Sequence, residues 1–167
     1  AAPAVTPPAI DSRTNLHSGR RQILTTDVLR WLEGEITSDL VCLLAVTTED
    51  LYPEESWNYV FGQATLDERV GVHSLARFFP EFWGEPDTSA ARRKGLVRSA
   101  SVLAHETGHA FGMEHCTAYE CDLNGSNSLD ELDRQFHELC PVCLRKLSWN
   151  IGFDPVATAL YPCAKMD

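Results

Sequence analysis

Apolar and polar positions along the chain predict strands that alternate with helices through its first two thirds. Residues 22–24 are expected to form a short strand, and the continuous apolar run Leu40–Val46 is typical of a central strand buried on both faces. Residues 57–61 predict another strand, which ends at Gly62. Residues 70–79 have the length of a strand, but their alternation leaves a polar residue on each face, which favours an edge strand.

Two helices are expected in the same part of the chain. The first begins near Thr26 and buries Val28, Trp31 and Leu32. The second is longer: Thr88 or Ser89 caps it, it runs to about Phe111, and the glycine at position 112 is a natural stop. Its apolar stripe consists of Leu96, Ala100 and Leu103.

Helix and loop dominate the last third. A capping box formed by Ser128 and Glu131 predicts a helix over residues 129–139, and Asp154 followed by Pro155 begins a last short helix. The order of these elements predicts an α/β fold with an N-terminal lobe and a smaller C-terminal lobe.

The length of 167 residues and the 44% hydrophobic content suit one compact domain, which we divide into three segments. Residues 1–15 are proline-rich and are expected to form a flexible tail. Residues 16–112 form the predicted N-terminal α/β lobe, and residues 113–167 form the C-terminal lobe.

The net charge of −10 narrows the range of partners. An acidic surface repels phosphate groups and anionic lipid, so nucleic-acid and membrane-surface binding are not expected. No apolar stretch reaches the ~18–20 residues that a membrane-spanning helix needs. We therefore expect neither a nucleic-acid nor a membrane partner, and we expect the protein to be a monomer.

The sequence His105-Glu106-Thr107-Gly108-His109, late in the long predicted helix, is an HExxH motif. Residues four apart lie about 40° apart around a helix, so both imidazoles can reach one metal ion. Gly112 permits a sharp exit that returns His115 as a third ligand. Three histidines and an adjacent carboxylate suit a catalytic zinc whose fourth position is left to water.

Four cysteines follow this motif as two close pairs, Cys116 with Cys121 and Cys140 with Cys143. Their spacing predicts a tetrahedral structural zinc site, and two local disulfides are the alternative. Because His115 and Cys116 are neighbours, the second zinc should brace the third ligand of the first. A reduced site of four cysteines also favours a cytoplasmic location.

These motifs resemble the signature of the archaemetzincins, a branch of the metzincin-type zinc peptidases. The stretches that carry the likeness are HETGHAFGMEHC at 105–116, CPVC at 140–143, TTEDLYP at 47–53, VFGQA at 60–64, RVGVHSLARF at 69–78 and NGSNSLDELD at 124–133. The likeness covers about residues 20–147. One position departs from the family pattern Cys-x-Met-Asn, because Leu123 stands where the methionine is expected.

The resemblance implies a small α/β zincin with a twisted mixed sheet over an active-site helix and two zinc ions per chain, one catalytic and one structural. It also implies that a peptide substrate lies antiparallel along an edge strand, for which residues 70–77 are the candidate. Glu106 would act as general base and acid for a zinc-bound water that hydrolyses a peptide bond. Endopeptidase and aminopeptidase action both stay open. The alternative is a zinc-stabilised binding module with a catalytically silent HExxH site.

Overall fold

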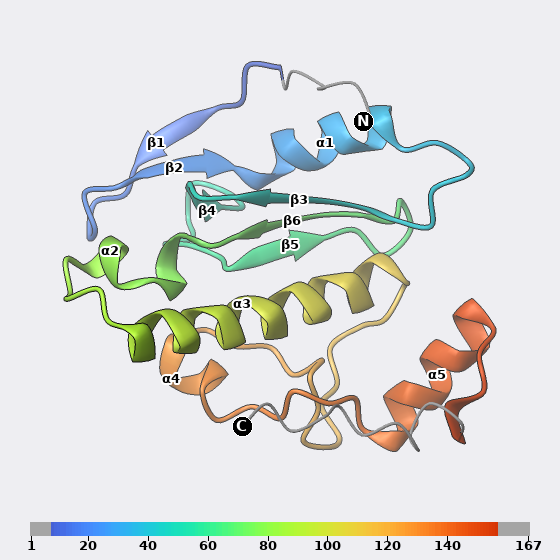
Figure 1. Cartoon of the computed structure of the whole chain (residues 1–167). Helices are drawn as coiled ribbons and strands as arrows, with labels where there is room; N and C mark the ends of the chain where they lie inside the picture. The colour runs from blue at the N-terminus through green and yellow to red at the C-terminus, as the bar shows by residue number, and fades with distance from the viewer. Residues whose placement is uncertain (1–7, 157–167) are drawn as a thin grey trace.

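The computed structural model describes residues 8–156, in which strands lie between a helix above and a helix below (Figure 1). The strands are β1 (Ser12–Thr14), β2 (Arg21–Leu24), β3 (Leu43–Thr47), β4 (Asp50–Tyr52), β5 (Gly62–Ala64) and β6 (Val70–Ser74). The helices are α1 (Thr25–Glu35), α2 (Pro80–Trp83), α3 (Ser89–Ala110), α4 (Leu129–Leu132) and α5 (Pro141–Ile151), and Ala76–Phe78 is a 3-10 turn. The predicted α/β class is confirmed.

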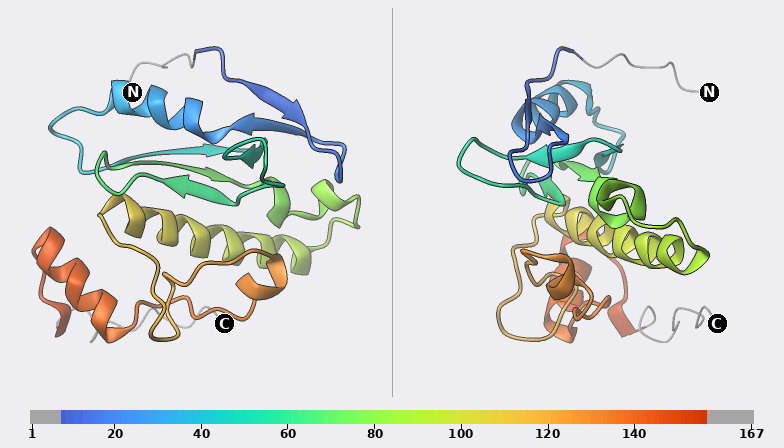
Figure 2. Two further views of the ribbon diagram at one scale, coloured as in Figure 1. Left: turned by 180° about the vertical axis from the view of Figure 1, so that it is seen from behind. Right: turned by 90° about the vertical axis from the view of Figure 1, so that its left-hand side faces the viewer.

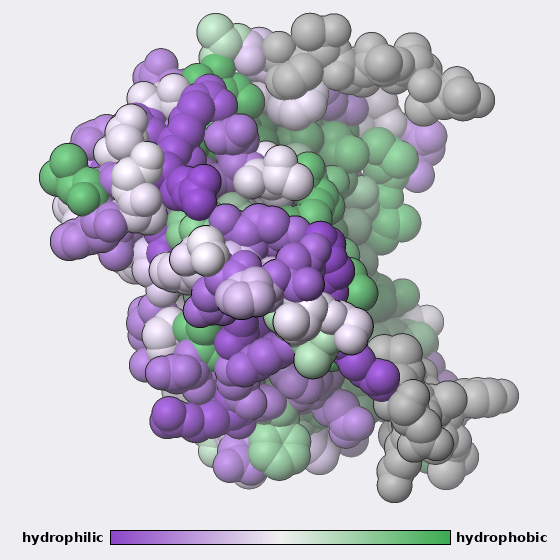
Figure 3. Space-filling view, turned by 60° about the vertical axis from the view of Figure 1, so that its left-hand side comes forward, coloured by the Kyte–Doolittle hydropathy of each residue, from purple (hydrophilic) through white to green (hydrophobic). Residues whose placement is uncertain are grey.

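The strands form two small sheets, with the orders β1-β2-β4 and β3-β6-β5. Each is mixed: β3 is parallel to β6 and β5 antiparallel to it, while β2 is antiparallel to β1 and parallel to β4. Both views in Figure 2 place α1 and α3 on opposite sides of these strands. Hydrophilic side chains cover most of the face drawn in Figure 3.

The prediction that residues 70–79 form an edge strand is wrong. The strand is shorter, and β6 lies between β3 and β5 with every one of its residues buried. The two polar residues that suggested an edge each make a hydrogen bond inside the protein, although His73 Nδ1 is buried without a partner. His73 Nε2 lies 3.1 Å from Ser99 Oγ, and the hydroxyl of Ser74 donates to the carbonyl of Glu49 at 2.7 Å. The edge strands of this sheet are β3 and β5. The prediction that Leu40–Val46 forms a central strand buried on both faces is therefore also wrong, because β3 pairs only with β6 and its Val46 side chain is 54% exposed.

Residues 57–61 do not form the predicted strand. They belong to the loop between β4 and β5, where Val60 forms only an isolated bridge with Leu51. The aromatic residues that favoured a strand pack instead into a cluster, in which the rings of Tyr59 and Phe61 are 5.3 Å apart.

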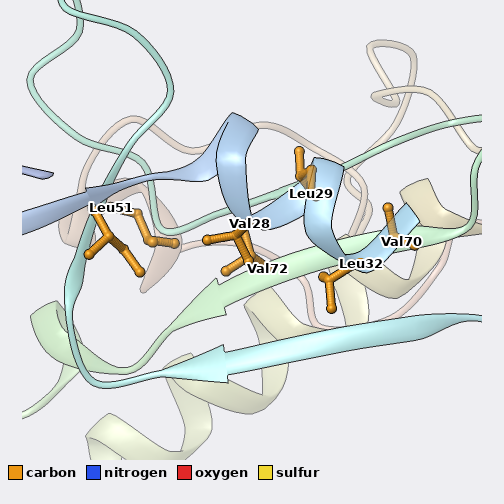
Figure 4. Packing of buried hydrophobic residues seen from close by; sticks show 7 residues of the cluster. Val28, Leu29, Leu32, Leu51, Val70 and Val72 are labelled. Atoms are coloured by element: carbon orange, nitrogen blue, oxygen red, sulfur yellow. The ribbon is translucent and has the colours of Figure 1, made fainter. Parts of the chain in front are cut away.

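The main apolar core lies between α1 and the sheets. Val28, Leu29 and Leu32 of the helix belong to one buried cluster with Leu51, Val70 and Val72 (Figure 4). The predicted burial of Val28 and Leu32 is confirmed, and Trp31 is partly buried. The helix begins at Thr25 without a side-chain cap.

The predicted bounds of α3 are close to those observed, and Thr88 caps it by accepting from the backbone N–H of Ala91. Its predicted apolar stripe is wrong, because Leu96 is 62% exposed and Ala100 also faces solvent. The buried face instead carries small or functional residues. At Gly95 an added Cβ would lie 2.8 Å from the carbonyl oxygen of Phe78, so glycine brings the helix close to the chain that leads out of β6.

The C-terminal segment holds one short helix and one that the periodicity did not predict. Ser128 caps α4 as expected, but the helix has only one turn rather than extending to residue 139. The chain then runs irregularly and brings Cys140 beside Cys121, where α5 begins. Most of the helix expected from Asp154 lies outside the described residues. The expected N-terminal tail contains β1, which pairs with β2.

Within residues 8–156, no helix combines the length and the apolar character that a membrane span requires.

Candidate metal centres

The last turns of α3 bring two histidines of the HExxH motif to one face, and the chain then returns a third. Gly112 has φ of 74°, a left-handed conformation that ends the helix and redirects the backbone toward His115. His105 Nε2 lies 3.0 Å from His109 Nε2 and 3.2 Å from His115 Nε2. Two nitrogens bound to one tetrahedral zinc ion stand about 3.3 Å apart, so the cluster has the dimensions of a zinc site.

Hydrogen bonds fix which ring nitrogens carry protons. His105 Nδ1 donates to the carbonyl of Asp122 at 2.7 Å, and His109 Nδ1 donates to the carbonyl of Met113 at 2.6 Å. The two Nε2 atoms therefore face each other as unprotonated acceptors, an arrangement that repels unless a cation lies between them. Burial also lowers the pKa of His105 to about 4 and lowers that of His109, which keeps both rings neutral.

Glu106 lies next to this cluster and is almost wholly buried, with 5% of its surface exposed. Its Oε2 atom has no hydrogen-bond partner, and burial raises the pKa of the carboxyl to about 8. The carboxyl packs directly against Gly62 of β5, where an added Cβ would lie 2.6 Å from Oε1. The HExxH motif identifies Glu106, whereas the importance of Gly62 is visible only in the contact between β5 and α3.

Leu123 lies against α3 beneath the two helical histidines. It is fully buried, and a Cβ added at Gly108 would lie 2.7 Å from its Cδ2 atom. The leucine thus fills the space beside the His105–His109 turn with an apolar side chain that offers no ligand to a metal.

The four cysteines form the second cluster. The Sγ atoms of Cys116, Cys121, Cys140 and Cys143 all lie within 4.8 Å of one another, and each of these cysteines is a free thiol. Cys116 Sγ and Cys140 Sγ are 3.9 Å apart, close to the ~3.8 Å of two sulfurs on one tetrahedral zinc ion.

Backbone N–H groups support these sulfurs. The N–H of Cys140 donates to Cys121 Sγ at 3.3 Å, and the N–H of Cys143 donates to Cys140 Sγ at 3.4 Å. Cys140 is also the N-cap of α5, and its sulfur accepts from the first turn of that helix. The donor set and its spacing fit zinc.

The turn between the clusters holds both of them. Asp122 provides the carbonyl that orients His105, and the carbonyl of Leu123 accepts from the N–H of Cys116 at 2.9 Å. The Asn124 amide donates to the carbonyl of Cys116 at 2.6 Å. The expected brace between the sites therefore runs through residues 121–124 as well as through the covalent link from His115 to Cys116.

A cleft runs along the edge strand and past the histidines. A hollow of ≈ 920 Å³ lies on one side of Glu106 and is bounded by the loop after β4 and by residues 124–127. A smaller hollow of ≈ 380 Å³ lies on the other side and reaches Leu66 and Glu114. In the right-hand view of Figure 2, the loop after β4 and the segment after α3 lie one above the other on the same side of the molecule.

The backbone of β5 has a free edge in this cleft. Phe61 accepts from the N–H of Ser74, and Thr65 donates to the carbonyl of Val70, so the odd-numbered residues bond to β6. In an antiparallel pair the alternate residues point the other way, which leaves the N–H and C=O groups of Gly62 and Ala64 directed at the cleft.

Comparison with known proteins gives a consistent result. The profile of peptidase family M54 matches residues 16–149. Archaemetzincin-2 of Pongo abelii is 37% identical over 166 residues, which cover 86% of this chain and 46% of that protein. The chain thus spans about half the length of the curated relatives it matches.

Two crystal structures are similar in both sequence and fold. Archaemetzincin from Methanopyrus kandleri matches with a TM-score of 0.66 and 35% identity, covering 79% of this chain and 67% of that one. A zinc-dependent peptidase from Methanocorpusculum labreanum matches with a TM-score of 0.63 and 30% identity, covering 73% and 72%. On this evidence the chain belongs to the archaemetzincins, peptidase family M54.

Proposed function

We propose that the chain is a zinc-dependent peptidase in which His105, His109 and His115 hold the catalytic ion. The observation that carries this proposal is the convergence of three Nε2 atoms, two of them fixed as acceptors, beside a buried carboxylate with a free oxygen. The facing histidine nitrogens repel one another unless a cation lies between them, and the side of the cluster without a histidine opens into the cleft.

Zinc bound there would supply a Lewis acid that activates water and polarises the peptide carbonyl. Glu106 takes the proton of the attacking water and delivers it to the leaving amine. Its Oε2 atom has no hydrogen-bond partner in the protein, so this oxygen is available to a water molecule beside the histidines. Gly62 leaves the room that lets the carboxyl stay beside the histidines.

The substrate adds to the sheet as an extra strand. Gly62 and Ala64 offer their free backbone groups to a peptide that runs antiparallel to β5. Its amino-terminal part then lies near Leu66 and Glu114, and its carboxyl-terminal, or primed, part lies beside the loop after β4.

The cysteine cluster would hold a second, structural zinc ion. Four sulfurs fill a tetrahedral shell and leave no position for water, so this site stabilises the fold and does no chemistry. Thiolates of this kind persist in a reducing compartment, which supports the cytoplasm as the location.

The test compares the wild type with Glu106→Gln. Zinc per chain is measured by mass spectrometry, and a diverse peptide library is digested with each protein. We expect two zinc ions in both proteins, cleavage by the wild type that chelator abolishes, and a loss of at least about 100-fold in Glu106→Gln. Glu120→Gln, at an exposed position outside the cleft, is the matched control and should cleave normally. Zinc binding without cleavage by the wild type would refute the proposal and favour a binding module.

A further inference from the structure

One hydrogen bond crosses the larger hollow from wall to wall. The hydroxyl of Tyr59, in the loop after β4, donates to the carbonyl of Asn127 at 2.9 Å, and both residues line the hollow. Within residues 8–156 this is the one hydrogen bond that joins the 53–61 loop to the 113–128 segment. The bond lies at an exposed position, on the solvent side of the apolar side chains beneath it.

The upper end of this bond is firmly anchored. The guanidinium of Arg77 lies 3.6 Å from the centre of the Tyr59 ring, and Phe61 contacts the ring edge-on. Arg77 in turn forms a buried ion pair with Asp50 at 2.8 Å. The phenol is therefore held in place over the hollow.

The lower end is held less directly. The N–H of Asn127 donates to Glu131 in α4 at 2.6 Å, which fixes the chain just before that helix. The residues before Asn127 are the Gly125–Ser126 pair, and the Ser126 hydroxyl has no partner. If the bond to Tyr59 breaks, it is this lower wall that can move away.

The bond lies where the primed part of a peptide has to pass. Gly62 marks the position of the Glu106 carboxyl, and Tyr59 is three residues earlier in the chain, so their backbones are at most about 10 Å apart. A peptide strand needs about 4.8 Å from each neighbouring chain, so it cannot thread between two groups that are 2.9 Å apart. Between the Glu106 carboxyl and the Tyr59–Asn127 bond, the hollow has an apolar floor that consists of Phe61, Val102 and Leu132.

We propose that Tyr59 is a specificity-determining residue that closes the primed side of the cleft. The site then favours peptides that have about three residues or fewer after the scissile bond, one of them with a large apolar side chain. This inference rests on the proposed function only in taking the histidine cluster as the zinc site and β5 as the strand that pairs with substrate. A longer peptide has to break the Tyr59–Asn127 bond or leave the cleft.

The test measures binding rather than turnover. Each peptide begins with a succinyl hydroxamate, which anchors its amino-terminal end on zinc. Phe and then zero to five alanines follow, and the peptide ends in an amide. The amide keeps charge constant, which matters because the described residues that line the larger hollow include Glu54 and Glu106 but no Lys or Arg. Dissociation constants are measured by calorimetry for the zinc-loaded wild type, Tyr59→Phe and Tyr119→Phe. Tyr119 is exposed and lies outside the cleft lining, so it is the matched control.

The ratio of wild-type to Tyr59→Phe dissociation constants should stay near one for peptides with one or two primed residues. It should rise to about fivefold beyond three residues, the factor that one lost hydrogen bond represents. Tyr119→Phe should give a ratio near one at every length. A Tyr59→Phe ratio that does not change with length, or the absence of hydroxamate binding by zinc-loaded protein, would overturn the inference. Loss of peptide cleavage with an intact length step would instead count against the proposed function alone.

Discussion

Gly62 gives the sharpest test of how the fold positions the carboxylate that we propose as catalytic, that of Glu106. In Gly62→Ala the new Cβ would lie 2.6 Å from Glu106 Oε1 and 2.7 Å from Cγ. The carboxyl must retreat by about 0.8 Å to restore an ordinary contact of ~3.4 Å. The glutamate side chain can rotate away, so the fold itself should tolerate the methyl group.

The expected result is a loss of function without a loss of structure. A displacement of about 1 Å in a catalytic group can reduce kcat about 100-fold. We expect kcat on a cleaved peptide to fall about 100-fold in Gly62→Ala, while zinc content stays at the wild-type value and Tm changes by only a few degrees. Turnover, zinc per chain and thermal unfolding are measured on the same preparation.

Gly34→Ala is the matched control, because nothing lies within 4 Å of a Cβ at that position in α1. It should keep full kcat and gain about 0.5–1 kcal/mol of stability from helix propensity. The reasoning is refuted if Gly62→Ala keeps kcat within threefold of wild type. It is equally refuted if the variant loses zinc or unfolds, because the methyl group would then act through the fold and not through Glu106.

Three further predictions concern stability and metal content. Burial lowers the pKa of His73 from 6.5 to about 4, so the unfolded chain binds the proton more tightly than the folded chain does. The stabilisation is therefore full above pH 6.5 and is lost as the pH falls toward 4, by up to about 3 kcal/mol in the free energy of unfolding measured with urea. His73→Gln should show a correspondingly weaker pH dependence. Cys140→Ser should reduce zinc from two ions to one per chain and lower Tm, and unchanged zinc content would contradict the assignment of a four-cysteine zinc site. Ser128→Ala removes the cap of α4 and should cost about 1 kcal/mol in the same unfolding assay, against little change for Ser56→Ala at an exposed loop position.

The candidate ligands could be located from sequence because their geometry is local. His105 and His109 are one helical turn apart wherever the helix forms, and Gly112 permits the turn that brings His115 back. Spacing also grouped the cysteines into two pairs, and the Sγ atoms of all four lie within 4.8 Å of one another. The caps at Thr88 and Ser128 were predictable for the same reason, since each depends on residues three positions apart.

The errors share a different cause. Whether β6 is an edge or a central strand depends on β3 and β5, whose pairing the pattern of β6 does not contain. His73 Nε2 and the Ser74 hydroxyl find partners on α3 and on the chain after β3, so these two polar residues do not signal exposure. The buried face of α3 follows the same rule, because close approach to the sheet requires glycine at position 95 rather than a leucine stripe.

The order of residues thus determined which side chains could bind metal, since helical repeat and short ligand spacing act within a few residues. Packing between distant segments decided how those side chains are used. The carbonyl of Asp122 orients His105 from 17 residues away, and Gly62 makes room for Glu106 from a strand that lies far back in the chain. Contacts of this kind depend on the summed burial of the whole core, so no short window of sequence contains them.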